Sequence, residues 1–151
     1  MLILIVIAVT ASCRWSMLPM SDTQQFWFSH EKLDVYQEAI LFVGRLSTLM
    51  DGKVRIGDVK DQLDRASTSI LLNLAEGNGK YSLKDRCRFF DTAHGSALEC
   101  AAGLDVLVAK GIVTAVQIRP GKENLQRIVQ MLMGLIKRNS SREYERRSGE
   151  T

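Results

Sequence analysis

Catalysis by this chain of 151 residues would depend on few reactive side chains, because the sequence holds two histidines and three cysteines. Asp91 and His94 lie three residues apart, a spacing that places both side chains on one side of a helix and is typical of half a di-iron site. The second half of such a site is missing, and Cys13, Cys87 and Cys100 form neither a CxxC motif nor a Cys/His cluster. We therefore expect no catalytic residues, no metal and no cofactor.

Another group of polar residues recurs at helical spacing beside apolar ones. The group comprises Arg65, Ser69, Asn73, Glu76, Ser96 and Glu99. Polar groups are costly to bury unless they are hydrogen-bonded, so this pattern predicts a shared polar network in which Arg65 contacts Glu99 or Glu76. A network that fixes helix register or a subunit interface is favoured over a catalytic role.

Basic residues gather in two stretches of the sequence and could hold phosphate groups. The candidates are Lys80, Lys84, Arg86, Arg88, Arg127, Lys137, Arg138 and Arg142. An ordinary solvated surface is the alternative, because Asp85, Glu143 and Glu145 dilute both clusters and the formal net charge is only +3. Tyr81 and Tyr144 are the aromatic residues near these clusters, a small number that favours contacts with the phosphate backbone over base stacking.

Signals for helix ends show how the chain would position these side chains. Ser29 is a candidate N-cap, and Phe28 with Leu33 has the spacing of a hydrophobic staple. The first helix should end near Asp51-Gly52, where glycine can adopt the left-handed conformation. Apolar residues at spacings of three and four predict its buried face as Val35, Tyr36, Ala39, Ile40, Val43 and Leu46.

The second helix should begin near Asp58 and end at Gly77-Asn78-Gly79, and Ser82 with Asp85 should cap the third. Lys110-Gly111-Ile112 is the natural end of that third helix. The apolar stripe of the second helix comprises Val59, Leu63, Ala66, Ile70 and Leu74. That of the third comprises Phe89, Phe90, Ala93, Ala97, Cys100, Leu104 and Leu107.

The fourth helix should begin at Thr114, which forms a capping box with Gln117, while Val113 and Ile118 repeat the staple. Pro120 removes a backbone hydrogen bond, so we expect a kink or a short break after it. The apolar stripe then resumes with Leu125, Ile128, Val129, Leu132, Leu135 and Ile136.

Four helices joined by short loops predict an all-α fold, an antiparallel up-down-up-down four-helix bundle over residues 28–139. Residues 1–27 form an N-terminal extension, and residues 140–151 form a charged flexible tail. The second and fourth helices carry more apolar residues than one buried face needs, notably in Ile70–Leu74 and Val129–Ile136. The surplus indicates either a wide contact with the core or self-association.

The apolar run Leu2–Val9 is about half as long as a bilayer-spanning helix. No basic residue precedes it, as a signal peptide would require, and Ala11-Ser12-Cys13 is a poor lipoprotein cleavage site. We expect that translation begins at Met17 or Met20, with a true signal or a peripheral tail as alternatives. Cysteines without a pairing pattern fit reduced thiols in the cytoplasm, and we expect no membrane contact.

The second helix resembles the signature of the bacterial four helix bundle protein family. Its matching residues are Gln62, Arg65-Ala66, Ser69-Ile70, Asn73 and Ala75-Glu76-Gly77. Further matches are Leu33-Asp34-Val35-Tyr36, Arg88-Phe89-Phe90 through Ala93, Gly95-Ser96-Ala97-Leu98-Glu99, and Met131-Leu132 with Gly134-Leu135-Ile136. The resemblance covers roughly three quarters of the chain. The sequence departs from the family in the first interhelix loop, which lacks the common proline, and in the segment before Phe28, which has no counterpart.

The family includes proteins encoded within intervening sequences of bacterial large-subunit ribosomal RNA genes. It also includes the accessory variability determinants of diversity-generating retroelements, which are basic, pentameric barrels that bind nucleic acid and assist a reverse transcriptase. This sequence is similar to the second group through Gly95–Lys110 and the final helix. The resemblance implies a homo-oligomer, a pentamer above other sizes, with RNA or DNA and a reverse transcriptase as partners. The alternative is a protein-binding scaffold that contacts no nucleic acid. In both interpretations the protein is not an enzyme.

Overall fold

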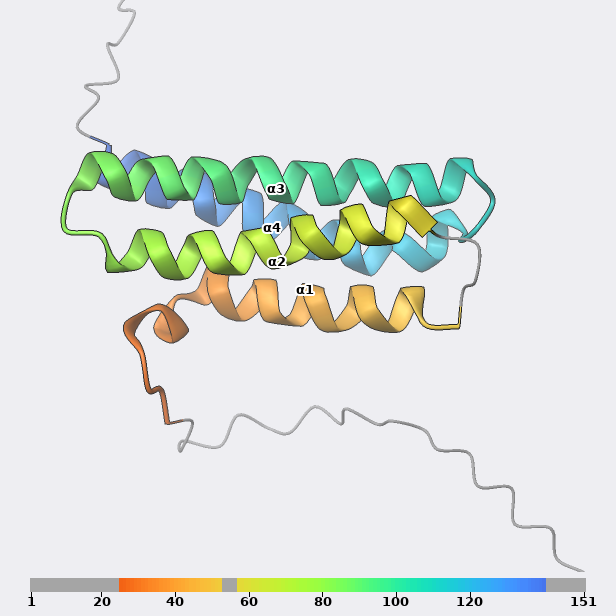
Figure 1. Cartoon of the computed structure of the whole chain (residues 1–151), viewed down its shortest axis with the longest axis horizontal. Helices are drawn as coiled ribbons and strands as arrows, with labels where there is room; N and C mark the ends of the chain where they lie inside the picture. The colour runs from red at the N-terminus through yellow and green to blue at the C-terminus, as the bar shows by residue number, and fades with distance from the viewer. Residues whose placement is uncertain (1–24, 53–56, 141–151) are drawn as a thin grey trace, which may run out of the picture.

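The computed structural model describes residues 25–52 and 57–140, and within these ranges the regular secondary structure is helical, with no strand. The elements are a short 3-10 helix η1 (Ser29–Lys32), followed by α1 (Asp34–Met50), α2 (Gly57–Gly79), α3 (Leu83–Ala109) and α4 (Ala115–Asn139). In Figure 1 the four α-helices lie side by side, and the chain reverses at alternate ends of the bundle. The expected extension 1–27 and tail 140–151 lie almost wholly outside the described residues.

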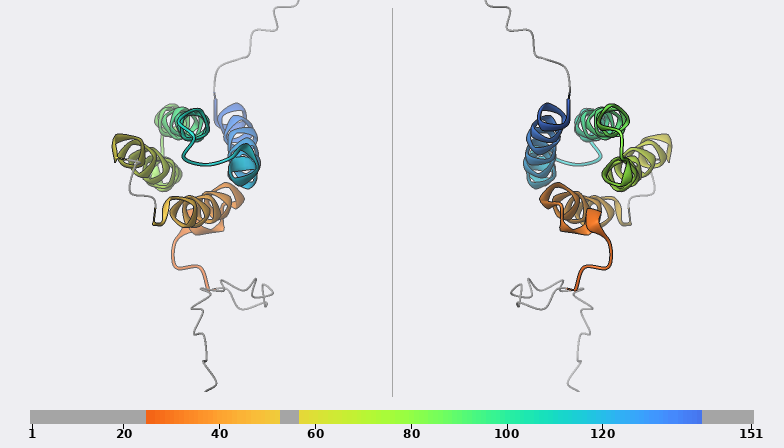
Figure 2. Two further views of the ribbon diagram at one scale, coloured as in Figure 1. Left: turned by 90° about the vertical axis from the view of Figure 1, so that its right-hand side faces the viewer. Right: turned by 90° about the vertical axis from the view of Figure 1, so that its left-hand side faces the viewer.

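The four helices surround one core, as the two end views of Figure 2 show. Each helix packs against two others, in the pairs α1–α2, α2–α3, α3–α4 and α1–α4. The α2–α3 pair is the most closely associated, and glycines explain how closely the two helices approach. A Cβ atom on Gly103 would lie 2.6 Å from Leu63 Cδ2, and one on Gly77 would lie 2.9 Å from Phe90 Cε1. Both distances are shorter than a van der Waals contact, so a side chain at either position would force its neighbours to shift.

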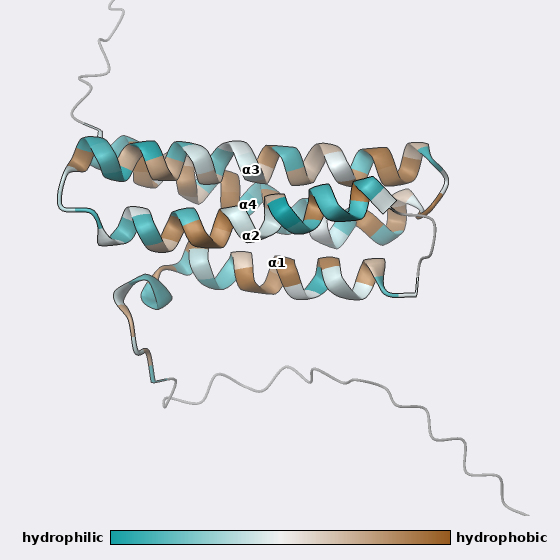
Figure 3. Cartoon of the chain, in the orientation of Figure 1, coloured by the Kyte–Doolittle hydropathy of each residue, from teal (hydrophilic) through white to brown (hydrophobic). Residues whose placement is uncertain are grey.

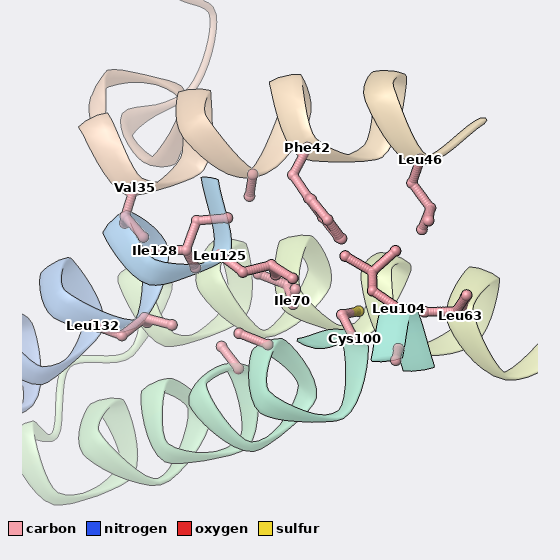
Figure 4. Packing of buried hydrophobic residues seen from close by; sticks show 14 of the residues in the cluster. Val35, Phe42, Leu46, Leu63, Ile70, Cys100, Leu104, Leu125, Ile128 and Leu132 are labelled. Carbon is pink, nitrogen blue, oxygen red and sulfur yellow. The ribbon is translucent and has the colours of Figure 1, made fainter. Parts of the chain in front are cut away.

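Apolar side chains from all four helices converge in the centre of the bundle (Figure 4). Those with almost no solvent exposure include Phe42, Phe90, Leu63, Ile70, Leu74, Leu104, Leu107, Leu125, Ile128 and Leu132. The expected stripes of α2, α3 and α4 are mostly buried, although Val59, Phe89, Val129, Leu135 and Ile136 are only partly so. This single core gives the bundle its stability, because burial of apolar area is the main favourable contribution to folding.

The stripe predicted for α1 is wrong at Ile40, which is exposed, and it omits Phe42, which is buried. Phe42 follows Ala39 by three residues and precedes Leu46 by four, so these three side chains form one regular face. Ile40 is the residue next to Ala39, and one residue turns a helix by about 100°. Its side chain therefore points away from the core.

The start of the bundle also differs from the prediction of one helix that begins at Ser29. A 3-10 helix occupies Ser29–Lys32, and Leu33 is extended with φ −78° and ψ 124° before α1 begins. The Glu31 carboxylate accepts hydrogen bonds from the backbone N–H groups of Trp27 (2.6 Å) and Phe28 (3.0 Å). This local cap stabilises the short helix as a separate turn.

The caps of α3 and α4 follow the prediction. Ser82 Oγ accepts from the Asp85 backbone N–H at 3.3 Å, and Thr114 and Gln117 form the reciprocal capping box. At the end of α3, Gly111 has φ +67°, a conformation that a residue with a Cβ rarely adopts. The Ile112 N–H donates to the Leu107 carbonyl, which completes the hydrogen bonding typical of a Schellman motif.

Pro120 does not break α4, which runs from Ala115 to Asn139 without interruption, so the structure shows no short break. The proline lies in the second turn, where it removes the one hydrogen bond to the Val116 carbonyl. The Val116 side chain is exposed, so water can reach this turn and hydrate the carbonyl.

Most of the surplus apolar residues of α2 and α4 pack against the core. Leu71, Val129, Met131, Leu135 and Ile136 are partly buried there, while Leu72 and Met133 stay exposed. The wide core contact therefore accounts for most of the surplus and leaves a small exposed remainder. Among the described residues, no helix has both the length and the apolar character needed to cross a membrane.

Candidate nucleic-acid interface

The pair considered as half a metal site, Asp91 and His94 on α3, gains no further ligand among the described residues. Asp91 is exposed and His94 is half-buried, and within residues 25–52 and 57–140 no three His, Cys, Asp or Glu side chains form a group that could hold a metal ion. Burial raises the pKa of the Cys100 thiol to about 12, and the Glu99 carboxylate contributes in the same direction. Cys100 is therefore protonated at neutral pH and is a poor nucleophile.

Three members of the expected polar group meet between α2 and α3. Ser69 Oγ and Ser96 Oγ are 2.8 Å apart, and Asn73 Nδ2 donates to the Ser69 carbonyl at 2.8 Å and to Ser69 Oγ at 3.0 Å. Ser96 Oγ also donates to the Thr92 carbonyl at 3.0 Å. These small hydroxyls satisfy one another where the two helices lie close together, which fixes the register between α2 and α3.

The charged members of that group are arranged differently from the expectation. Arg65, Glu76 and Glu99 are all exposed, and neither expected contact of Arg65 is formed. Arg65 Nη2 instead donates to Gln62 Oε1 at 2.5 Å, and Gln62 Nε2 donates to Glu99 Oε1, so a glutamine bridges the two charges. Glu76 pairs with Lys80 at 2.9 Å on its own helix. Water solvates these groups, so they do not need a buried network.

Most candidate cations lie at one end of the bundle, drawn at the left of Figure 1, where α2 ends, α3 begins and α4 ends. We call this region the basic end, and its candidates are Lys80, Lys84, Arg86, Arg88, Lys137 and Arg138. Two contacts join its helices: Arg86 Nη1 donates to Asn139 Oδ1 at 3.3 Å, and Cys87 Sγ donates to the Ile136 carbonyl at 3.7 Å. Figure 3 shows that the start of α3 is largely hydrophilic.

Two of these cations are occupied by contacts within the protein. Arg86 is half-buried, and its Nη2 donates to the Lys80 carbonyl at 2.8 Å, so it holds the α2–α3 connection against α4. Lys80 Nζ pairs with Glu76 and lies 4.7 Å from the centroid of the Phe89 ring. Arg86 is therefore a structural residue, and Lys80 is only partly available to a ligand.

Four cations of the basic end remain accessible. Arg88 is 78% exposed and makes only a long contact of 3.8 Å with Asp85, which contributes little in water. Lys84, Lys137 and Arg138 are exposed, and they form no ion pair with any described residue. These four side chains carry the positive charge that this surface offers to an anionic partner.

The remaining two candidates do not join this surface. Arg127 lies on α4, and its Nε and Nη2 donate to Glu38 Oε1 of α1 at 2.8 and 2.5 Å. Asn124 Nδ2 donates to the same carboxylate oxygen, so Arg127 belongs to a polar bridge between α1 and α4. Arg142, together with Tyr144, lies outside the described residues.

Exposed aromatic residues accompany the basic end, and two of them precede the first helix, away from the basic stretches of the sequence. Trp27 and Phe28 are 76% and 64% exposed, and Tyr81 in the α2–α3 connection is fully exposed. Asn78 Nδ2 of α2 donates to Ser29 Oγ at 2.8 Å, which docks η1 beside the end of α2.

The Glu31 carboxylate caps this segment. The Phe28 amide lowers the pKa of the Glu31 carboxyl, and the Trp27 amide adds to this effect, because both hydrogen bonds favour the charged carboxylate.

Comparison with known proteins supports the resemblance found in the sequence. The sequence profile of the family described as 23S rRNA-intervening sequence protein matches residues 31–134. The chain belongs to this family. A crystal structure of a protein of unknown function from the S23 ribosomal protein family of Bacteroides thetaiotaomicron VPI-5482 is similar, with a TM-score of 0.64 and 22% sequence identity. That match covers 68% of this chain and 98% of the other, and it shows a shared fold. Among curated proteins, none matches the sequence.

Proposed function

We propose that this member of the 23S rRNA-intervening sequence protein family is a non-enzymatic accessory protein that binds the phosphate backbone of RNA or DNA through its basic end. The observation that carries the proposal is the collection of four accessible cations, contributed by α3 and α4, at one end of the bundle. The start of α3 and the end of α4 are far apart in the sequence, and the fold brings their charges to one end of the bundle, where they can contact phosphates.

The family supports a link to nucleic acid only through its description, which associates these proteins with intervening sequences of 23S rRNA. The sequence resemblance to the accessory variability determinants extends the proposal to a partner, a reverse transcriptase that the bound nucleic acid would bring close. Neither the family nor the fold identifies a chemical reaction.

Self-association would strengthen such binding, because several linked subunits make later contacts on one strand effectively intramolecular. Exposed aliphatic side chains support a contact between copies, among them Leu72 on α2 and Met133 on α4. We propose a homo-oligomer, with a pentamer as the expected size from the family resemblance. Light scattering measures the size directly, and a stable monomer at micromolar concentration would remove this part of the proposal.

Fluorescence anisotropy with labelled RNA and DNA at several salt concentrations tests phosphate binding. The test variant replaces Lys84, Arg88 and Lys137 by glutamate. If each side chain neutralises one phosphate, the slope of log affinity against log salt should become shallower by about 2 to 3. Circular dichroism should show an unchanged bundle, because all three side chains are exposed.

The matched control replaces Arg45, Lys60 and Arg119 by glutamate, which changes the net charge equally but away from the basic end. The control should keep most of the wild-type affinity and slope. Equal losses in both variants would show that net charge decides binding and that the basic end has no special part. An absence of binding at low salt would favour the protein-binding scaffold, which the exposed aliphatic residues Ile40 and Leu41 of α1 also support.

A further inference from the structure

Exposed aliphatic residues and exposed aromatic residues lie in different parts of the bundle. Aliphatic ones are spread over α1, α2, α3 and α4, for example Leu41, Leu72, Leu98 and Val116. Within the described residues, every large aromatic side chain that is mostly exposed belongs to the basic end: Trp27, Phe28 and Tyr81. A general tendency to leave apolar surface uncovered would not confine the aromatic residues to one place.

Contacts with neighbouring residues hold two of these aromatic residues, Trp27 and Phe28, in position. The Glu31 carboxylate fixes the backbone of Trp27 and Phe28 through hydrogen bonds of 2.6 and 3.0 Å. The Phe28 ring stacks on His30 with centroids 5.8 Å apart, and His30 meets the Tyr36 ring of α1 edge-on at 4.8 Å. The start of the described chain is therefore anchored to the bundle on one side and presents Trp27 and one face of Phe28 to solvent.

At the basic end, η1 contacts α1 and α2, Tyr81 lies in the α2–α3 connection, and the accessible cations belong to α3 and α4, so aromatic rings and cations occupy neighbouring sides of one end of the bundle. Lys84, Arg88, Lys137 and Arg138 can contact phosphates, while the rings can stack on the faces of bases. Bases of a duplex already stack on one another and present only their edges in the grooves, so a flat ring on a protein surface reaches unpaired bases. The combination distinguishes a single strand from a duplex.

We infer that the basic end binds an unpaired single strand of nucleic acid, with phosphates on the cations of α3 and α4 and bases stacked on Trp27, Phe28 and Tyr81. The inference rests on the proposed function and specifies its ligand. Because every base has an aromatic face, such binding has little sequence preference. The strand can be RNA or DNA, since stacking and phosphate contact are common to both.

The experiment compares three labelled ligands of equal length, about 12 nucleotides, within the range of known single-strand sites. They are a single strand, the corresponding duplex, and a strand of the same charge in which most positions lack the base. The full-length protein should bind the single strand at least tenfold more tightly than the abasic strand. Replacement of Trp27 and Tyr81 by alanine should weaken single-strand binding at least tenfold and leave abasic-strand binding within twofold.

The matched control is Val116→Ala, which shortens an exposed aliphatic side chain at the start of α4, at the opposite end of the bundle, and should leave all three affinities unchanged. In a Trp15→Phe background Trp27 is the sole tryptophan, so its fluorescence should be quenched by the single strand and much less by the abasic strand. Equal binding of the single strand and the abasic strand, with no quenching, would overturn the stacking inference and leave phosphate binding intact. An absence of binding to all three ligands would overturn the proposed function itself.

Discussion

The close approach of α2 and α3 beside the basic end predicts that a single methyl group destabilises the bundle there. Gly77 is buried, and a Cβ at this position would lie 2.9 Å from Phe90 Cε1 and 3.0 Å from Phe89 Cβ. The Phe90 ring is almost fully buried, and the Phe89 Cβ moves only with the backbone of α3. Gly77→Ala therefore cannot be accommodated by rotation of an exposed side chain, and the two helices must separate slightly.

The expected magnitude combines two opposing effects. Overpacking a core costs about 1–3 kcal/mol, while replacing a helical glycine by alanine stabilises by about 0.5–1 kcal/mol. We expect a net loss of about 1–2 kcal/mol in the free energy of unfolding. For a domain of this size that loss lowers the melting temperature by about 4–8 °C. Thermal unfolding followed by circular dichroism at one fixed protein concentration measures the change.

The control is Gly79→Ala, in the same last turn of α2, where an added Cβ has no heavy atom within 4 Å. This variant should leave the melting temperature unchanged or raise it by a few degrees. A second substitution, Phe90→Leu, should reduce the cost of Gly77→Ala, because the shorter side chain removes the ring atom at 2.9 Å. The reasoning fails if Gly77→Ala is as stable as Gly79→Ala, since no steric conflict would then exist.

Two further predictions concern buried polar groups. Glu38→Ala leaves Asn124, which is 1% exposed, without its acceptor, so urea unfolding should show a loss of about 2 kcal/mol. The half-exposed Arg127→Ala should cost less, and equal costs would argue that the Asn124 contact is unimportant. The pKa of Cys100 is about 12 when folded and near 9 when unfolded, so the unfolded state loses this proton first as pH rises. The free energy of unfolding should therefore fall above pH 9 by up to about 1.4 kcal/mol per pH unit, and Cys100→Ala should remove that part of the slope.

The caps of α3 and α4 could be predicted from the sequence because they depend on neighbouring residues, whereas the start of the first helix at Ser29 was predicted wrongly. Ser82 and Thr114 bind backbone groups three residues away, and Gly111 closes α3 through its own conformation. A contact of that range can be read from the order of residues alone. The phase of α1 was harder, because the run Ala39-Ile40-Leu41-Phe42 offers an apolar residue at every position, and only the packed helices determine which ones are buried.

The candidate interface could not be predicted fully from the sequence, because it depends on contacts between residues that are distant in the sequence. Arg127 looked available for phosphate, but its acceptor Glu38 is 89 residues away in the sequence. Arg86 is likewise bound by Asn139, which lies 53 residues further along. Trp27 belongs to this end of the bundle because η1 docks on α2 through Asn78, a contact that sequence spacing does not reveal. The sequence shows which residues are basic, but the tertiary contacts determine which of these side chains are accessible to a ligand.

An even number of helices has a practical consequence for protein engineering. Since α1 begins and α4 ends at the basic end, an affinity tag, a fluorophore or a fused enzyme joined directly to Gln25 or Ser140, where the described residues begin and end, would lie next to the surface proposed for nucleic acid (Figure 1). The α3–α4 connection around Gly111 lies at the opposite end. A circular permutant opened there, with a linker that joins Ser140 to Gln25, would carry its labels far from that surface.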